Sequence, residues 1–276
     1  MTGCPVWKSF PISAKRFRRT GGNRDRIPRK AALAERSIAM NGRDRLPVCA
    51  IVGVGPGNGT ALARRFASEG YAVAMLARTT ALTEPLAAEL PRARSYPCDV
   101  TDAAAVQETF ARVARELGVV DVLIYNAGKG VWGAAADVSP EDFEECWRVN
   151  GFGAFLAARA VIPAMMFSAS GNIIFIGATA SRRGAARAAA FASAKAGQRV
   201  LAESLARAYG PLGVHVSVIV VDGIVGEPLM RARFSDKPDS FFVKPDDVSD
   251  IAMMLTRQRR SAWSFELEAR PFGEAW

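Results

Sequence analysis

The stretch "GVGPGNGTALARRF", residues 53–66, decides the fold. It carries four glycines, namely Gly53, Gly55, Gly57 and Gly59. An apolar run precedes this stretch, and a helical pattern follows the glycines. Glycine allows a tight turn and a close approach of the backbone to a ligand, and the N-terminus of a helix binds anions. In this context the spacing Gly53-x-x-x-Gly57-x-Gly59 indicates a dinucleotide diphosphate site, with an ordinary glycine-rich turn as the alternative.

Beyond this loop, apolar runs typical of strands alternate with alanine-rich helical stretches. The runs cover residues 48–52, 71–76, 93–98, 120–125, 172–177 and 214–221. Helices are expected to begin near Gly59, Leu82, Asp102, Pro140 and Ala186. A seventh, half-buried strand is predicted within "AWSFELEA", residues 262–269, where apolar and polar residues alternate. The pattern predicts an α/β fold with a single doubly wound parallel sheet that helices cover on both faces.

Two segments differ from this alternation. Residues 226–244 form the only long interruption between the last strands, and we expect them to be a substrate lid. Residues 151–167 are the most apolar long stretch, but Arg159 and Pro163 interrupt it and it is short for a bilayer span. This stretch is predicted to be a buried or subunit-facing helix, and no membrane association is expected.

The formal net charge of +9 resides in the N-terminal segment. Residues 1–46 contain twelve Lys or Arg residues against Asp25, Glu35 and Asp44, so residues 47–276 are neutral. This balance makes nucleic acid an unexpected partner for the predicted domain, residues 47–276. Residues 1–46 are expected to be a disordered basic arm. The alternatives are an upstream start, with Met40 as the true initiator, and an organelle-targeting arm.

The residue after the second predicted strand bears on the choice of cofactor. Arg78 lies nineteen residues beyond Gly59, where an acidic residue would bind a ribose 2′-hydroxyl. An arginine suits a 2′-phosphate instead, because its guanidinium binds phosphate through two hydrogen bonds. The sequence therefore favours NADP(H) over NAD(H), unless Arg78 is only a surface charge.

Five motifs in order resemble those of one known family. They are the glycine loop, "CDV" at 98–100, "YNAG" at 125–128, Asn150 and Phe191-x-x-x-Lys195. Their order is similar to that of the short-chain dehydrogenase/reductase family over about residues 47–276. The resemblance implies a Rossmann-type sheet of seven strands and a small-molecule substrate. It also implies a homodimer or homotetramer built on the long helices after strands four and five.

The resemblance implies roles for individual residues. Asp99 would contact the adenine, Asn126 would brace the sheet beneath the cofactor, and Lys195 would bind the nicotinamide ribose. Without the family, Asp99 is a cap or turn residue, Asn126 a turn former and Lys195 a solvated helix charge. The cofactor-binding residues expected on this basis are Gly53, Gly55, Gly57, Asn58, Gly59, Arg78, Asp99, Val100, Asn126, Ala127, Gly128, Lys195 and Gly223.

The catalytic set of the family is incomplete in this chain. Hydride addition to a carbonyl leaves an alkoxide, so reduction requires a proton donor and a dipole that holds the oxygen. The family uses tyrosine, lysine, serine and asparagine for this. Here Phe191 stands at the tyrosine position and Ala178 at the serine position.

Three ways of replacing the missing hydroxyls remain open. Thr179 or Ser181 could take the place of the serine after a small shift of the loop. Lys195 could relay a proton through water if desolvation lowers its pKa. An iminium or a conjugated alkene would need no acid at an oxygen atom. The candidate catalytic residues are therefore Lys195, Asn150, Thr179 and Phe191.

The remaining polar residues give weaker signals. Asp222, where the family usually has proline, is either a turn former or an acid with a shifted pKa. Glu227, Arg182 and Arg183 either face the substrate or lie solvated at the surface. His215 is expected to be a core residue with a satisfied hydrogen bond. With one histidine and four scattered cysteines, we expect neither a metal site nor disulfides, and a cytoplasmic location.

These observations predict an NADP(H)-dependent oxidoreductase with an atypical proton-donor site. Its substrate would be a small, apolar carbonyl, imine or enone. The alternative is a catalytically silent NADP-binding protein that acts as a sensor or partner subunit.

Overall fold

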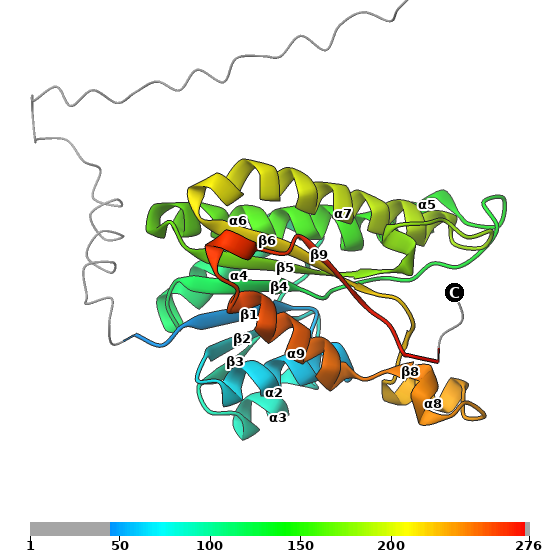
Figure 1. The fold of residues 1–276 in the computed structure, drawn as a ribbon, viewed down its shortest axis with the longest axis horizontal. Helices are drawn as coiled ribbons and strands as arrows, with labels where there is room; N and C mark the ends of the chain where they lie inside the picture. Colours follow the sequence, from blue (N-terminus) through cyan, green and yellow to red (C-terminus); the bar gives the residue numbers. More distant parts are fainter. Residues whose placement is uncertain (1–44, 274–276) are drawn as a thin grey trace, which may run out of the picture. The chain divides into compact units, whose positions relative to one another are not determined.

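The computed structural model describes residues 45–273, and the sheet at its centre has seven parallel strands (Figure 1). Their spatial order is β3-β2-β1-β4-β5-β6-β9. The strands are β1 Val48–Val52, β2 Ala72–Ala77, β3 Ala93–Pro97, β4 Val120–Tyr125, β5 Gly171–Ala178, β6 Val214–Val221 and β9 Glu266–Ala269. The order reverses after β3, so the sheet is doubly wound, and the predicted fold class is confirmed. The predictions for residues 1–44, including Met40, lie outside the described residues.

Helices cover both faces of the sheet (Figure 1). The longer ones are α2 Asn58–Ser68, α3 Thr83–Glu89, α4 Ala103–Glu116, α5 Pro140–Trp147, α6 Gly153–Ser168, α7 Ala189–Tyr209 and α9 Pro245–Thr256. Helices α4, α6 and α7 bury one set of apolar residues against the sheet. Helices α2, α3 and α9 bury a second set on the opposite face. Strands covered on both faces explain why the sequence shows continuous apolar runs instead of alternation.

Three elements differ from the sequence prediction. Helix α7 begins at Ala189, three residues after the expected Ala186. Helix α9 was not predicted, although Pro245 at its first position and Asp246 in its first turn are typical of a helix start. Strand β9 is shorter than the alternating stretch and begins only at Glu266.

The most apolar stretch forms part of one long helical segment. Residues Pro140–Ser168 are continuous through α5, a π-helical turn η1 (Arg148–Phe152) and α6, and by length and hydropathy could cross a membrane. Half of the most apolar window is buried inside the fold. Exposed Phe155 and Phe167 lie on the outer side of α6, where the chain was predicted to face a subunit.

The predicted lid is a folded unit. Strand β7 (Ile224–Val225) pairs in parallel with β8 (Phe242–Val243), and the short helix α8 (Pro228–Arg233) lies between them in sequence. This unit includes Ile224–Val225, just before the predicted segment 226–244. Strand β6 precedes the unit and helix α9 follows it, so one end is fixed to the sheet and the other to a helix that covers the sheet.

Candidate active site

Three of the four glycines lie where a side chain would collide with the protein. Gly53 has φ +87°, and a Cβ atom there would lie 2.4 Å from the Cα and N atoms of Ala127. A Cβ on Gly59 would lie 2.6 Å from Cα of Val54. A Cβ on Gly57 would lie 2.9 Å from Cβ of Glu227. Gly55 differs, because a Cβ there would meet nothing within 4 Å. The loop between β1 and α2 is therefore as tight as the glycine spacing predicts, except at Gly55.

The N-terminus of α2 opens from this loop. Its cap residue Gly57 has no side chain, and the first turn contains no acidic residue. The Oδ1 atom of Asn58 is buried and has no hydrogen-bond partner among the described residues. Uncapped helix amides carry a partial positive charge and suit an anion.

Asn126 connects β4 to β1 at this edge of the sheet. Its side-chain Nδ2 donates to the carbonyl oxygen of Gly53 at 2.7 Å, and its backbone N donates to that of Val52 at 2.9 Å. Strands β1 and β4 end level with each other, since Val52 pairs with Tyr125. Asn126 thus fixes the first glycine of the loop from the neighbouring strand.

The residues predicted at the adenine end lie together at the ends of β2 and β3. Asp99 accepts hydrogen bonds from the backbone N and the Oγ1 of Thr101, both at 2.8 Å. These bonds, with a smaller contribution from the nearby charge of Arg78, hold the pKa of the Asp99 carboxyl below its ordinary value. Arg78 is exposed, and Val100 is buried beside Gly153. None of these residues lines the cleft described next.

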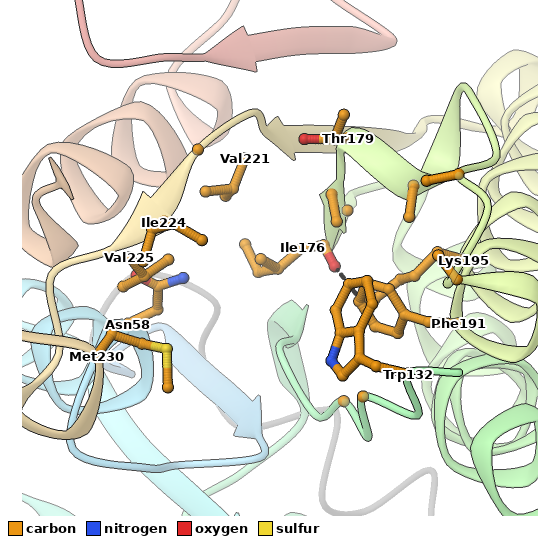
Figure 2. Close-up of a pocket in the computed structure, with 18 of the residues that line it drawn as sticks. Asn58, Trp132, Ile176, Thr179, Phe191, Lys195, Val221, Ile224, Val225 and Met230 are labelled. Carbon is orange, nitrogen blue, oxygen red and sulfur yellow. Dashed lines mark hydrogen bonds between the residues drawn. The ribbon is translucent and has the colours of Figure 1, made fainter. Parts of the chain in front are cut away.

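A cleft of about 710 Å³ lies at the carboxyl ends of β5 and β6 (Figure 2). Ile224, Val225 and Met230 form one wall, and Trp132, Phe191 and Lys195 lie across from them. Its lining is mostly apolar, which suits an apolar substrate. Of the predicted site residues, the cleft brings together Asn58, Asn126, Gly128, Thr179, Phe191, Lys195 and Gly223.

Lys195 is the buried cation of the cleft. Its Nζ donates to the carbonyl oxygen of Ile176 at 2.8 Å (Figure 2) and to Oε1 of Gln198 at 3.2 Å. Burial lowers the pKa of Lys195 to about 8, because a charged ammonium loses its hydration. The solvated-charge interpretation of Lys195 is therefore wrong. Gln198 was not predicted, although its position one turn after Lys195 places both on one helix face.

Phe191 lies one turn before Lys195 and packs against an aromatic neighbour. Its ring centroid is 4.9 Å from that of Trp132, whose side chain is largely exposed at the mouth of the cleft. No side chain supplies a hydroxyl at this place, since Ser193 is exposed and bonds back to the carbonyl oxygen of Ala190. Ser181 is buried and accepts from the backbone N of Ala178, so it does not line the cleft.

Asn150 is fully buried in the π-helical turn η1 and does not line the cleft. Its Nδ2 donates to the carbonyl oxygens of Lys129 and Cys146, each at 2.8 Å. The backbone carbonyl oxygen of Asn150 accepts a hydrogen bond from Nε2 of Gln198 at 2.8 Å. Asn150 therefore connects the loop after β4 to the helix that carries Lys195.

Thr179 and Asp222 meet because β5 and β6 end in register, with Ala178 opposite Val221. The Oγ1 of Thr179 donates to Oδ1 of Asp222, and Nη2 of Arg270 donates to Oδ2 of Asp222 at 2.6 Å. Burial alone would raise the pKa of the Asp222 carboxyl, but these two bonds hold it below its ordinary value. The pKa of Asp222 is therefore shifted, and the shift is downward. Its ion pair with Arg270 is a contact that a turn former alone would not need.

The other charged candidates divide between cleft and surface. Arg183 and Glu227 line the cleft, although the side chain of Arg183 is also largely exposed. Arg182 does not, since it pairs with Glu266 at 2.7 Å and also with Glu268.

His215 and the cysteines take no part in the cleft. His215 is buried, its Nε2 lies 2.9 Å from the carbonyl oxygen of Ser264, and its ring stacks on Trp263, so the predicted core role is confirmed. Cys49, Cys98 and Cys146 are buried free thiols. Within residues 45–273, no group of histidine, cysteine or acidic side chains could hold a metal ion.

Comparisons with known proteins place the chain in a family. Residues 47–238 match the model of the short chain dehydrogenase family. The 2,3-dihydro-2,3-dihydroxybenzoate dehydrogenase of Bacillus subtilis is 32% identical over 227 residues, which cover 74% of this chain and 87% of that protein.

Solved structures agree with this match. A metagenomic short-chain oxidoreductase in complex with NADP is 28% identical, with a TM-score of 0.71 over 83% of this chain and 98% of that one. The alcohol dehydrogenase of Thermococcus sibiricus, complexed with 5-hydroxy-NADP, is 25% identical, with a TM-score of 0.75 over 84% of this chain and 99% of that one. The fold, the glycine loop and these similarities agree, and the chain belongs to the short-chain dehydrogenase/reductase family of oxidoreductases.

Proposed function

We propose that the protein is an NADP(H)-dependent oxidoreductase that acts on a small, apolar substrate without a tyrosine proton donor. The observation that carries the proposal is the glycine loop, in which Gly53 and Gly59 leave no room for a Cβ atom and lead into the uncapped N-terminus of α2. Such a cradle fits a dinucleotide diphosphate. The buried, unpartnered Oδ1 of Asn58 beside it adds a polar group for the ligand.

The same proposal assigns the remaining cofactor contacts. Arg78 would bind the 2′-phosphate, Asp99 and Val100 would adjoin the adenine, and Lys195 would bind the nicotinamide ribose. Ala127, Gly128 and Gly223 supply backbone close to the cleft. When bound there, a nicotinamide would supply hydride-transfer chemistry at the apolar cleft. The chain's own residues would position the substrate, exclude water and set the polarity around the reacting atom.

Calorimetry with NADPH, NADP⁺, NADH and NAD⁺ tests the cofactor assignment. We expect binding of both NADP forms, and weaker binding of the NAD forms by about 10-fold, which is the loss of one hydrogen bond to a charged group. No heat with any of the four would refute the proposal.

Turnover separates an enzyme from a silent cofactor-binding protein. A panel of ketones, imines and enones is incubated with NADPH, and its oxidation is followed by absorbance. Binding without oxidation by any substrate would favour the silent protein. Replacement of Phe191 by Tyr adds the missing hydroxyl one turn from Lys195. A silent scaffold would gain ketone reduction, whereas an enzyme adapted to Phe191 would lose activity on its own substrate.

We also propose a homodimer or homotetramer that uses the outer faces of α6 and α7. Phe155 and Met166 on α6 are exposed and border a hollow shared with Leu205 and Tyr209 of α7. Light scattering coupled to gel filtration tests this assembly, and a monomer at micromolar concentration would exclude it.

A further inference from the structure

Among the described residues that line the candidate cleft, Thr179 is the one that carries a hydroxyl group. Its proton is already engaged, because Oγ1 of Thr179 donates to Oδ1 of Asp222. A threonine hydroxyl has one hydrogen to donate and two lone pairs to accept with. The direction of this single hydrogen bond therefore decides what Thr179 can offer to a ligand.

Asp222 stays ionised, which fixes that direction. Its second oxygen accepts from Nη2 of Arg270 at 2.6 Å, with both side chains at least nine-tenths buried. A second guanidinium lies near its other oxygen, because Nη2 of Arg183 is 3.7 Å from Oδ1 of Asp222. A carboxylate between two guanidinium groups only accepts hydrogen bonds. Thr179 must donate to it, so toward a ligand that contacts its hydroxyl Thr179 can only accept a hydrogen bond.

Apart from the largely exposed guanidinium of Arg183 and the third N–H of Lys195, the groups around Thr179 provide little for a carbonyl oxygen. Phe191 has no hydroxyl, and Ser181 is held by the backbone N of Ala178. Lys195 directs two of its three N–H bonds at Ile176 and Gln198. A ketone oxygen placed against Thr179 would face another acceptor, and the alkoxide formed on reduction would face it more unfavourably.

We propose that the cleft takes an amine–iminium pair, whose nitrogen donates a hydrogen bond to Thr179, and that it rejects the corresponding ketone. This inference rests on the proposed NADP(H)-dependent function. In the reductive direction the iminium carbon gains a hydride from reduced nicotinamide, and the C=N π electrons become the nitrogen lone pair. The positive charge passes to the oxidised nicotinamide, and no proton is transferred. The reaction balances without an acid at position 191.

An alcohol would also donate to Thr179, but its oxidation releases a proton at the moment of hydride loss. Asp222 would have to receive that proton through Thr179. Its ion pair with Arg270 stabilises the carboxylate and makes it a weak base. The amine therefore fits the cleft better than the alcohol. Preferential oxidation of the alcohol is one of the results that the test below can give.

The test compares ligands of one shape. A cyclic imine, 1-methyl-3,4-dihydroisoquinoline, and a ketone, 1-tetralone, are offered with NADPH at neutral pH. Their reduced forms, the secondary amine and 1-tetralol, are offered with NADP⁺. Binding of the amine to the NADP⁺-loaded protein is also measured by calorimetry, which gives a readout independent of turnover.

The matched variants are Thr179→Val, which keeps the shape and removes the lone pairs, and Thr179→Ser, which keeps the hydroxyl. We expect amine binding to weaken by about 10-fold or more in Thr179→Val, as for loss of a hydrogen bond to a charged group, and to recover in Thr179→Ser. NADPH affinity should stay unchanged in both, whereas the melting temperature of Thr179→Val alone should fall, because the buried carboxylate of Asp222 loses one hydrogen bond. We expect kcat/KM for the imine to exceed that for 1-tetralone by about 100-fold.

Three results would overturn the inference. These are faster reduction of 1-tetralone than of the imine, oxidation of 1-tetralol in preference to the amine, and equal amine binding by wild type and Thr179→Val. Absence of NADPH binding by the wild type would instead refute the proposed function itself, so the two failures are distinguishable.

Discussion

Replacement of Gly59 by Ala, compared with Gly55→Ala in the same loop, tests whether the glycine loop binds a diphosphate. A Cβ on Gly59 would lie 2.6 Å from Cα of Val54 and 3.0 Å from the carbonyl oxygen of Gly53. Both contacts are with backbone, so the start of α2 must move away from the loop. At Gly55 the same methyl group meets nothing within 4 Å, and φ there is not positive.

The expected effect on stability is modest. Overpacking costs about 1–3 kcal/mol, and alanine in a helix regains up to about 1 kcal/mol over glycine. Gly59→Ala should therefore lose about 0–3 kcal/mol, and its melting temperature should fall by at most about 12 °C in a domain of this size. Gly55→Ala should change stability by no more than about 0.5 kcal/mol.

The expected effect on binding is larger. Displacement of the α2 N-terminus removes at least one hydrogen bond to a charged phosphate, worth about 1.5–3 kcal/mol. NADPH affinity of Gly59→Ala should fall about 10- to 150-fold, and that of Gly55→Ala less than about 2-fold. Calorimetry gives the affinities and thermal unfolding gives the stabilities. If the folded Gly59→Ala protein binds NADPH as tightly as the wild type, the loop is not the diphosphate site.

Three further predictions concern charged residues. Arg78→Ala should weaken NADPH binding about 10-fold and leave NADH binding unchanged, since only NADPH carries the 2′-phosphate; equal losses measured by calorimetry would exclude this role. Burial lowers the pKa of Lys195 from 10.5 to about 8, so between pH 8 and pH 10.5 this side chain is protonated only in the unfolded state. The free energy of unfolding should therefore rise with pH over this interval, by as much as about 3 kcal/mol. Urea unfolding of Lys195→Met should lack this rise, and a rise equal to that of the wild type would show that other groups cause it. Glu227→Gln should tighten NADPH binding about 10-fold, because it removes a carboxylate that lies against Gly57 of the glycine loop, where the diphosphate is expected. Glu84→Gln, at the exposed start of α3, is the control, and an equal gain there would point to net charge alone.

The sequence predicts the sheet well because its strands are short apolar runs between helical stretches. The relation between Phe191 and Lys195 is also local, since residues four apart on a helix share a face. Helix α9 was missed although Pro245 and Asp246 mark its start, because it follows the irregular segment 226–244.

The contacts that decide the chemistry are not local. Thr179 and Asp222 are 43 residues apart, and the register of β5 and β6 brings them together. A strand register depends on packing and cannot be read from one sequence. The same holds for Glu227 beside Gly57, which are far apart in the chain and belong to different layers.

The contact between Glu227 and Gly57 has a consequence for kinetics. Glu227 is the cap residue of α8, and Met230 of that helix lines the candidate cleft. A molecule that binds against Gly57 must therefore displace or reorient the start of the segment predicted to be a substrate lid. We expect a compulsory order of addition, with the nucleotide entering before the substrate and leaving after the product.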